Sequence, residues 1–176
     1  MVKLPKKYLI DTNIPITANW SVSPEGIPDE LVACVQRCVH TIEHVVMKKG
    51  SLVLDDGDEI FSEYRKKLSF SGQPGMGDAF LKWVHDNRWN FPPVDRVEIT
   101  VSDDSYDQFP DHPDLISFDD DDRKFVAVSN AHPEKPPILQ GTDSEWLRWE
   151  EALLEVGIKV VFICNSYVKQ KYMEKF

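Results

Sequence analysis

The sequence predicts an α/β fold in which a mostly parallel sheet carries helices on both faces. Three observations predict it. Short apolar runs of strand length recur along the chain, apolar residues between them follow helical spacing, and the two kinds of segment alternate from the N-terminus. The 176 residues correspond to about one domain, and 41% hydrophobic residues are enough to form its core.

The first part of the chain alternates strands and helices. Residues 7–10 and 51–55 are short apolar runs, as is typical of strands buried in a parallel sheet. Apolar residues recur every three or four positions over 29–47 and 59–68, which predicts two amphipathic helices. Residues 14–20 are expected to form a short helix or turn.

The rest of the chain is irregular before it returns to this alternation. A glycine-rich break over 71–77 precedes a helix over 78–87. Alternating apolar residues predict a strand over 94–101, and the acidic segment 102–118 is expected to be a loop. The remaining elements are expected to be a helix over 123–131, a strand over 138–140, a helix over 145–155, a strand over 159–163 and a short polar helix or tail over 166–176.

The charge of the chain is negative and uneven. The formal net charge is −10, and residues 103–122 contain nine Asp and no Lys or Arg. A protein that coats nucleic acid by electrostatic attraction alone is expected to be basic, so this class is disfavoured. An enzyme whose acidic residues hold metal ions escapes the objection, because the ions reverse the local field.

The cysteines predict the compartment. An odd, small number of them (Cys34, Cys38 and Cys164) without a signal peptide favours free thiols and a reducing, cytoplasmic location. A zinc site of Cys34 and Cys38 with His40 and His44 is conceivable, but His40 is rotated off the helical face of the cysteines, so packing is favoured. No apolar run approaches the ~20 residues that span a bilayer, so no membrane partner is expected.

Four acidic residues occupy similar positions in the predicted fold. Asp11 follows the first strand, Glu63 lies in the helix after the second, Asp122 opens a helix and Asp143 follows the strand over 138–140. In an open α/β sheet, strand ends and helix starts converge on one edge. Carboxylates gathered there suit Mg²⁺ or Mn²⁺ and would raise one another's pKa without a cation. The sequence therefore predicts a metal site for phosphate-ester hydrolysis.

Each of these acids also has a purely structural interpretation. Asp11 could cap the turn that follows it, and Asp143 could cap the last long helix. Glu63 could pair with Lys67 four residues later. Asp122 could be a first-turn acid that the helix dipole favours.

Other side chains are candidates for supporting roles. The third acid is ambiguous among Asp119, Asp120, Asp121 and Asp122, and Asp122 is best placed because it leads directly into the helix. The supporting candidates are Thr12, Asn13 and Thr142 to orient ligands or waters, Glu145 as a substitute or fifth acid, and Arg123 to contact phosphate.

Four blocks of sequence resemble the PIN-domain metal-dependent nucleases, in the order found in that family. They are residues 9–13 (Leu-Ile-Asp-Thr-Asn), 63–64 (Glu-Tyr), 122–127 (Asp-Arg-Lys-Phe-Val-Ala) and 138–145 (Ile-Leu-Gln-Gly-Thr-Asp-Ser-Glu). The resemblance implies a three-layer α/β/α sandwich around a mostly parallel central sheet of about five strands. It also implies one PIN-like domain over 1–176.

The same resemblance implies an activity. Asp11, Glu63, Asp122 and Asp143 look like the catalytic residues of an Mg²⁺- or Mn²⁺-dependent endoribonuclease, with Asp11, Asp122 and Asp143 as the metal ligands. Many such proteins are the toxin of a toxin–antitoxin pair. Candidate partners are therefore RNA, an antitoxin or another protein, and a second copy of the chain.

The chain departs from the family in two places. A helical and irregular insert over about 70–117 is longer than in compact toxin members, and its Trp83 and Trp89 could stack on unpaired bases. Glu145 stands where a second Asp is common.

Two other functions remain open. The fold could be a catalytically silent scaffold that binds a protein or RNA. A phosphatase that forms a phosphoenzyme on Asp11 is disfavoured, because such enzymes usually need a second Asp two positions later, where this chain has Asn13.

Overall fold

The computed structural model describes residues 3–47, 51–70 and 75–176. Its main sheet has four strands in the order β2-β1-β7-β8, and all three pairings are parallel. This confirms a mixed α/β fold with a parallel sheet, with four strands in it instead of about five. The strands are β1 (Lys7–Ile10), β2 (Ser51–Leu52), β7 (Ile138–Gln140) and β8 (Val160–Phe162).

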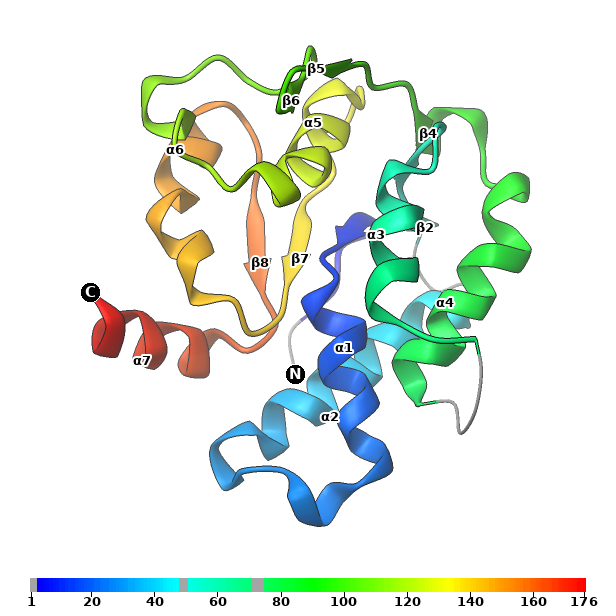
Figure 1. Cartoon of the computed structure of the whole chain (residues 1–176), viewed down its shortest axis with the longest axis vertical. Helices are drawn as coiled ribbons and strands as arrows, with labels where there is room; N and C mark the ends of the chain where they lie inside the picture. Colours follow the sequence, from blue (N-terminus) through cyan, green and yellow to red (C-terminus); the bar gives the residue numbers. More distant parts are fainter. Residues whose placement is uncertain (1–2, 48–50, 71–74) are drawn as a thin grey trace.

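The described residues form seven α-helices, which Figure 1 shows around the sheet. In that view α3 and α4 lie to the right of β7 and β8, and α6 lies to their left. The helices are α1 (Asn13–Asn19), α2 (Asp29–Val46), α3 (Glu59–Lys67), α4 (Met76–Asn87), α5 (Arg123–Ala131), α6 (Glu150–Glu155) and α7 (Asn165–Lys175).

The register of the sheet brings the ends of β1 and β7 to the same edge. Ile10 pairs with Leu139, so the next residues, Asp11 and Gln140, leave the two strands at the same level. On the other side of β7, Gln140 pairs with Phe162 of β8. The carboxyl ends of three neighbouring strands therefore lie together, where ligands of parallel sheets usually bind.

The strand expected over 51–55 is divided, because the chain changes partners at Val53. β2 pairs with β1, whereas β3 (Leu54–Asp55) pairs in parallel with β4 (Arg96–Val97). The Asp55 carboxylate then accepts hydrogen bonds from two backbone N–H groups in the first turn of α3, at 2.7 and 2.9 Å. β3 therefore sets the direction in which α3 starts.

The strand expected over 94–101 is mostly wrong. Within 94–101, Arg96–Val97 (β4) pairs with β3, and residues 98–100 belong to no strand. The last residue, Val101, belongs to a separate strand, Val101–Ser102 (β5), which pairs antiparallel with Ser105–Tyr106 (β6) of the expected acidic loop. The hairpin turns at Asp103, which has a positive φ of 52°. Asp tolerates this conformation better than most residues, and the alternating apolar pattern could not signal the turn.

The helix expected over 145–155 is also divided. Residues Ser144–Arg148 form a 3₁₀ turn, and α6 begins only at Glu150. Side chains three apart eclipse in 3₁₀ geometry. Trp146 and Trp149 accordingly both pack on Phe118, with ring centroids 5.1 and 4.8 Å away.

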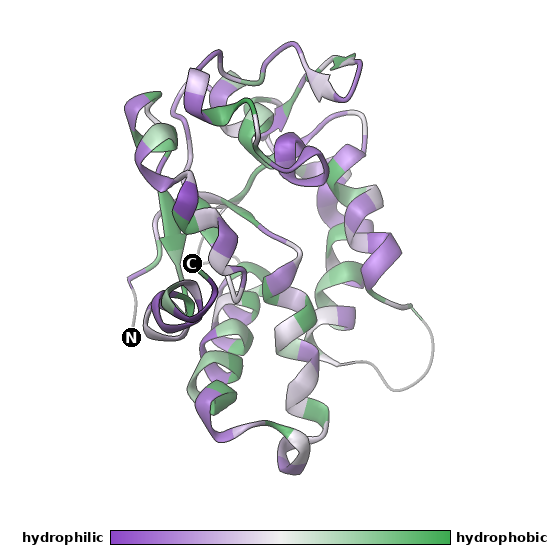
Figure 2. Cartoon of the chain, turned by 60° about the vertical axis from the view of Figure 1, so that its left-hand side comes forward, coloured by the Kyte–Doolittle hydropathy of each residue, from purple (hydrophilic) through white to green (hydrophobic). Residues whose placement is uncertain are grey.

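One buried cluster joins the sheet to its helices. Tyr8, Leu9 and Ile10 of β1 are fully buried in it. Figure 2 shows hydrophobic and hydrophilic residues interspersed along the helices, whereas α7 at the C-terminus is mostly hydrophilic. Residues 71–74 of the expected break over 71–77 lie outside the described residues, and α4 begins at Met76, within the expected break and two residues before the expected helix over 78–87. Among the described residues, no helix is both long enough and apolar enough to cross a membrane.

Candidate functional site

Asp11 stands at the carboxyl end of β1. Its side chain is buried, and its Oδ2 accepts a hydrogen bond from the backbone N–H of Asn13 at 2.8 Å. Its own N–H donates to Leu139 O of β7 at 3.0 Å. Asp11 therefore stabilises the turn into α1, as a capping residue does, and its carboxylate also lies at the edge of the sheet.

Asp122 and Asp143 reach the same edge from other elements. Asp122 directly precedes α5 and is half-buried, and its Oδ2 accepts a hydrogen bond from the indole N–H of Trp146 at 3.2 Å. Asp143 follows β7, and its Oδ1 accepts the backbone N–H of Glu145 at 2.9 Å. Asp143 is thus the N-cap of the 3₁₀ turn, which matches its structural interpretation.

These three carboxyl groups act on one another electrostatically. Burial is the largest cause that raises the pKa of Asp11 to about 6 and the pKa of Asp122 to about 8. The charge of Asp143 contributes to both shifts, and Asp11 and Asp119 contribute to that of Asp122. Burial also raises the pKa of Asp143. The structure therefore brings the three acids into one group, while their catalytic roles stay a prediction.

The group is looser than a set of carboxylates around one ion. Among the residues that the structure describes, only Cys34, Cys38 and Cys164 form a group of three or more metal-ligating side chains with every ligand atom within 4.8 Å of the others. The oxygens of the acids are therefore more widely spaced.

Two buried polar atoms beside this group have no hydrogen-bond partner in the described part of the chain: Thr12 Oγ1 and Gln140 Nε2. Gln140 also lowers the pKa of Asp11, although its Nε2 forms no hydrogen bond of good geometry within the described residues. Its Oε1 accepts the N–H of Gly141 at 2.8 Å. Unsatisfied buried polar groups are uncommon and call for an explanation such as a bound ion or water.

Gln140 and Trp146 were missed by the sequence analysis. A signal for Gln140 existed, because it is a polar residue at the end of an apolar strand and Asp11 has the same position on β1. No comparable signal marked Trp146, since its contact with Asp122 joins segments 24 residues apart.

Glu63 is held by lysines at the flank of the group. Its Oε2 lies 3.1 Å from Lys124 Nζ and 3.7 Å from Lys66 Nζ. Lys124 is buried in the first turn of α5, close in sequence to Asp122. The structural interpretation of Glu63 as an ion-pair residue is therefore correct in kind, but its partners are Lys124 and Lys66 instead of Lys67.

The run of four aspartates is differentiated by its surroundings. Asp119 caps its own turn by accepting the N–H of Asp121, and Asp120 pairs with Arg123 at 3.1 Å. Asp119, Asp120 and Asp121 are exposed, whereas Asp122 is partly withdrawn from solvent. Asp122 is thus the member best placed to act with Asp11.

Arg123 is occupied within its own loop. Its guanidinium donates to the carbonyl oxygens of Phe118 at 3.0 Å and Ile116 at 2.8 Å. These bonds secure the acidic loop, which gives Arg123 a structural role apart from any contact with phosphate.

A pocket of about 370 Å³ borders the site beside α7. Glu145 forms an ion pair with Lys175, so the last helix is attached to the loop that carries Asp143. The pocket is lined by Thr142, Asp143, Ser144, Tyr167, Lys171, Glu174 and Lys175.

Trp89 and Trp83 of the expected insert differ in exposure. Trp89 is 59% exposed, and the guanidinium carbons of Arg88 and Arg96 lie 4.7 and 4.5 Å from its ring centroid. Trp83 is half-buried and packs on Phe91 at 5.8 Å. Packing therefore accounts for Trp83, while Trp89 remains the better candidate for stacking on a base.

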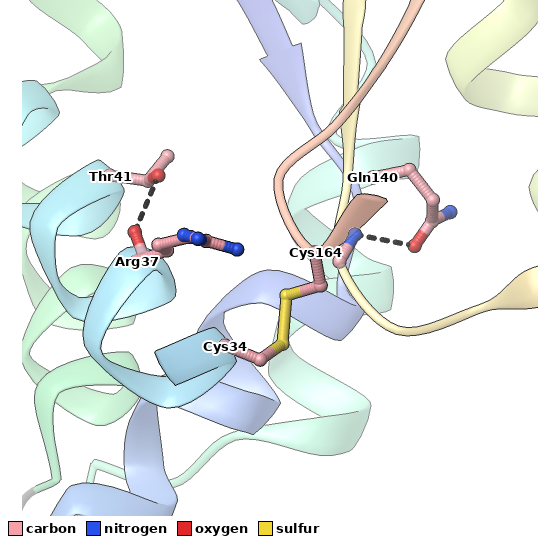
Figure 3. The surroundings of a disulfide bond; sticks show 6 residues. Cys34, Arg37, Thr41, Gln140 and Cys164 are labelled. Carbon is pink, nitrogen blue, oxygen red and sulfur yellow. Dashed lines mark hydrogen bonds between the residues drawn. A yellow bond between two sulfur atoms is a disulfide. The ribbon is translucent and has the colours of Figure 1, made fainter. Parts of the chain in front are cut away.

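The cysteines correct one expectation. Cys34 of α2 and Cys164 form a disulfide (Figure 3), so two of the three thiols are not free. Cys38 is the free cysteine, and it is buried. His40 is exposed, and His44 Nδ1 lies 2.9 Å from the hydroxyl of Tyr8. Neither histidine belongs to the compact cysteine group that the described residues form.

The arrangement as a whole can offer carboxylate oxygens, a hydroxyl and an amide to a cation, water or phosphate at the edge of a parallel sheet. Searches against protein-family models, curated proteins and solved structures found no match for the chain.

Proposed function

We propose that this protein is an Mg²⁺- or Mn²⁺-dependent endoribonuclease with a PIN-like, three-layer arrangement in a single domain. The observation that carries the proposal is the group of Asp11, Asp122 and Asp143. They come from three segments of the chain and lie at the carboxyl edge of the sheet, and the charge of Asp143 helps to raise the pKa values of Asp11 and Asp122. Strongly shifted titratable groups collected at such an edge are typical of active sites.

The residues present fit a hard divalent ion. Their oxygens are the ligand type that Mg²⁺ and Mn²⁺ prefer, and the unpartnered hydroxyl of Thr12 adds one more. The wide spacing of the acids is compatible with Mg²⁺, which keeps several waters and takes few carboxylates directly. We propose Asp11, Asp122 and Asp143 as the metal ligands, with Glu63 as the fourth catalytic acid.

The side chains of the site have separable tasks in this mechanism. A bound ion would polarise the phosphate and activate the attacking water. Asn13 and Trp146 hold the carboxylates of Asp11 and Asp122 in place through their N–H groups. Lys124 pairs with Glu63 at the flank of the group.

RNA is the proposed substrate, and Trp89 the proposed side chain for stacking on an unpaired base. With a net charge of −10, the protein is expected to need the cation to approach a phosphate backbone. A role as the toxin of a toxin–antitoxin pair, a homodimer and a cytoplasmic location belong to the same proposal.

The first prediction concerns cleavage. Purified protein is expected to cut a fluorescently labelled single-stranded RNA with Mn²⁺ or Mg²⁺, and EDTA is expected to stop it. Asp11→Asn should reduce the rate by more than about 100-fold, because a neutral amide is a poorer ligand. The matched control is Asp104→Asn, which removes one exposed charge from the acidic loop and should leave the rate unchanged. Equal cleavage by Asp11→Asn and wild type would refute the proposal.

A silent scaffold is the second candidate function, and one observation favours it. Three of the acids already make a structural contact: Asp11 with Asn13, Asp143 with Glu145, and Glu63 with Lys124. Calorimetric titration with Mn²⁺ separates the two functions. A nuclease should bind Mn²⁺ and lose that binding in Asp11→Asn, whereas a scaffold should show no binding that depends on Asp11.

A further inference from the structure

The sulfurs of three cysteines lie close together, near the point where β8 leads into α7. Cys34 and Cys38 are one turn apart in α2, and Cys164 lies between β8 and α7. The three sulfurs are all within 4.8 Å of one another, although Cys164 is 130 residues from Cys34. Figure 3 shows the Cys34–Cys164 bond beside Gln140, whose backbone oxygen accepts the N–H of Ile163.

The surroundings of these sulfurs are apolar. All three cysteines are buried, and burial raises the pKa of the Cys38 thiol to about 12. A bound cation is the usual means by which buried cysteines become stable thiolates, because the metal displaces the thiol protons.

The spacing suits a thiolate site. Metal–sulfur bonds of about 2.3 Å in tetrahedral geometry keep sulfurs about 3.8 Å apart. Once the disulfide is opened, side-chain rotation of Cys34 and Cys164 can bring the three sulfurs to that separation, since their Cα atoms are 5.2 Å apart. Thiolate sulfur selects soft ions, so this group would discriminate against the Mg²⁺ and Mn²⁺ expected at the carboxylates.

We propose that, in the reduced chain, the thiolates of Cys34, Cys38 and Cys164 bind one thiophilic d¹⁰ cation of the Zn²⁺ class. A thiol reductant first supplies two electrons and two protons to the disulfide and becomes a disulfide itself. The cation then displaces three protons from the thiols to solvent. A water molecule fills the fourth position, because the compact group contains three ligands among the described residues.

The cation site would link α2 to the start of α7 in the reduced chain, as the disulfide does in the oxidised chain. Disulfides persist in oxidising compartments and are reduced in the cytosol, where the cation would take over. The cross-link matters for α7, since Val168 is its only buried residue, while Tyr167 packs only partly against the core and Lys171 forms an ion pair with Glu30 at 3.4 Å. The proposal is independent of the nuclease activity.

Metal titration with Cd²⁺ as the probe tests the proposal. The protein is reduced, freed of reductant without air and titrated while sulfur-to-cadmium charge-transfer absorption is recorded. We expect one Cd²⁺ per chain with strong charge-transfer absorption, displacement of Cd²⁺ by Zn²⁺, and protection of all three thiols from alkylation by mass spectrometry. The oxidised protein is the matched control and should show no such absorption, because two ligands are in the disulfide.

Cys38→Ala should keep the disulfide and weaken Cd²⁺ binding in the reduced state by at least about 100-fold. Cys38→Val, which fills more of the buried space, serves if the alanine variant does not fold by circular dichroism. The proposal is overturned if reduced wild type binds Cd²⁺ no more tightly than either variant. It is also overturned if Cd²⁺ binds without charge-transfer absorption, since that result would assign the ion to carboxylates.

Discussion

At the residue scale, the acids at the sheet edge make structural hydrogen bonds and also have raised pKa values. Asp11 and Asp143 each accept a backbone N–H two residues ahead, which stabilises a turn whether or not a ligand is bound. Asp122 instead accepts a hydrogen bond from Trp146 across the fold. Hydrogen bonds to the charged form lower the pKa of a carboxyl, but burial opposes them and raises the pKa values of all three acids. The same holds for Asp55, which accepts two N–H groups at the start of α3.

The pH dependence of stability tests the state of Asp122. Folding raises its pKa from 3.8 to about 8, so the folded protein keeps a proton that the unfolded chain loses above pH 4. This residue's contribution to stability is therefore lost progressively as the pH rises from about 4 to about 8. Asp122→Asn should stabilise the metal-free protein at pH 8 by on the order of 1–3 kcal/mol and have little effect at pH 4.

Urea unfolding in EDTA at both pH values measures this effect. Asp121→Asn is the matched control, because Asp121 is the exposed neighbour and should show no such difference. If the Asp122→Asn midpoint equalled that of wild type at pH 8, the carboxyl would not be held in its protonated form.

At the element scale, α3 and α5 are positioned by polar contacts that reach across the fold. The Tyr64 hydroxyl of α3 donates to Ile10 O of β1 at 2.5 Å, which fixes α3 beside the strand that ends at Asp11. The Glu63–Lys124 ion pair then joins α3 to α5 at 3.1 Å, with side chains only 13% and 9% exposed. Such a shielded pair costs much more to break on one side than a surface pair does.

A double-mutant cycle measures the coupling between these two helices. Lys124→Met should lower the free energy of unfolding by about 2–4 kcal/mol, because Glu63 would be left charged and poorly solvated. The double variant with Glu63→Gln should recover part of that loss. Lys66→Met is the matched control: Lys66 pairs with the same carboxylate from an exposed position and should cost less than about 1 kcal/mol. Equal losses for both lysine variants would contradict the buried-pair account.

At the scale of the whole molecule, a disulfide links α2 to the start of α7. The Cys34–Cys164 disulfide connects α2 to the junction of β8 and α7, across a sequence separation of 130 residues. Constraining so long a loop lowers the entropy of the unfolded chain. The same tie keeps α7 beside the pocket that Asp143 lines.

Reduction of this disulfide should lower the free energy of unfolding by about 2–5 kcal/mol. Urea unfolding with and without reductant measures it, in EDTA so that no cation replaces the cross-link. Cys38→Ala should show the same loss on reduction, because it keeps both linked cysteines, whereas Cys34→Ala should no longer respond. An unchanged midpoint for reduced wild type would mean that the tie does not contribute to stability.

The elements with strong local signals were predictable. The expected strands at 7–10 and 138–140 and the helix over 123–131 have the observed bounds, because burial on both faces or helical periodicity is written in neighbouring residues. The division of 51–55 was not predictable, since it depends on the distant strand β4, which pairs with β3. The hairpin at Asp103 is local, but it depends on a positive φ that the alternating apolar pattern does not signal.

The amino-acid sequence thus determined the parallel α/β fold class and the candidate acidic residues, because hydrophobic periodicity and the ends of strands are local properties of the sequence. The folded arrangement alone revealed that Asp122 lies against Trp146, that Lys124 neutralises Glu63 and that Cys164 joins Cys34. Hydrogen bonds, ion pairs and disulfides form between atoms that are close in space, and no spacing along the chain records which distant segments the core brings into contact.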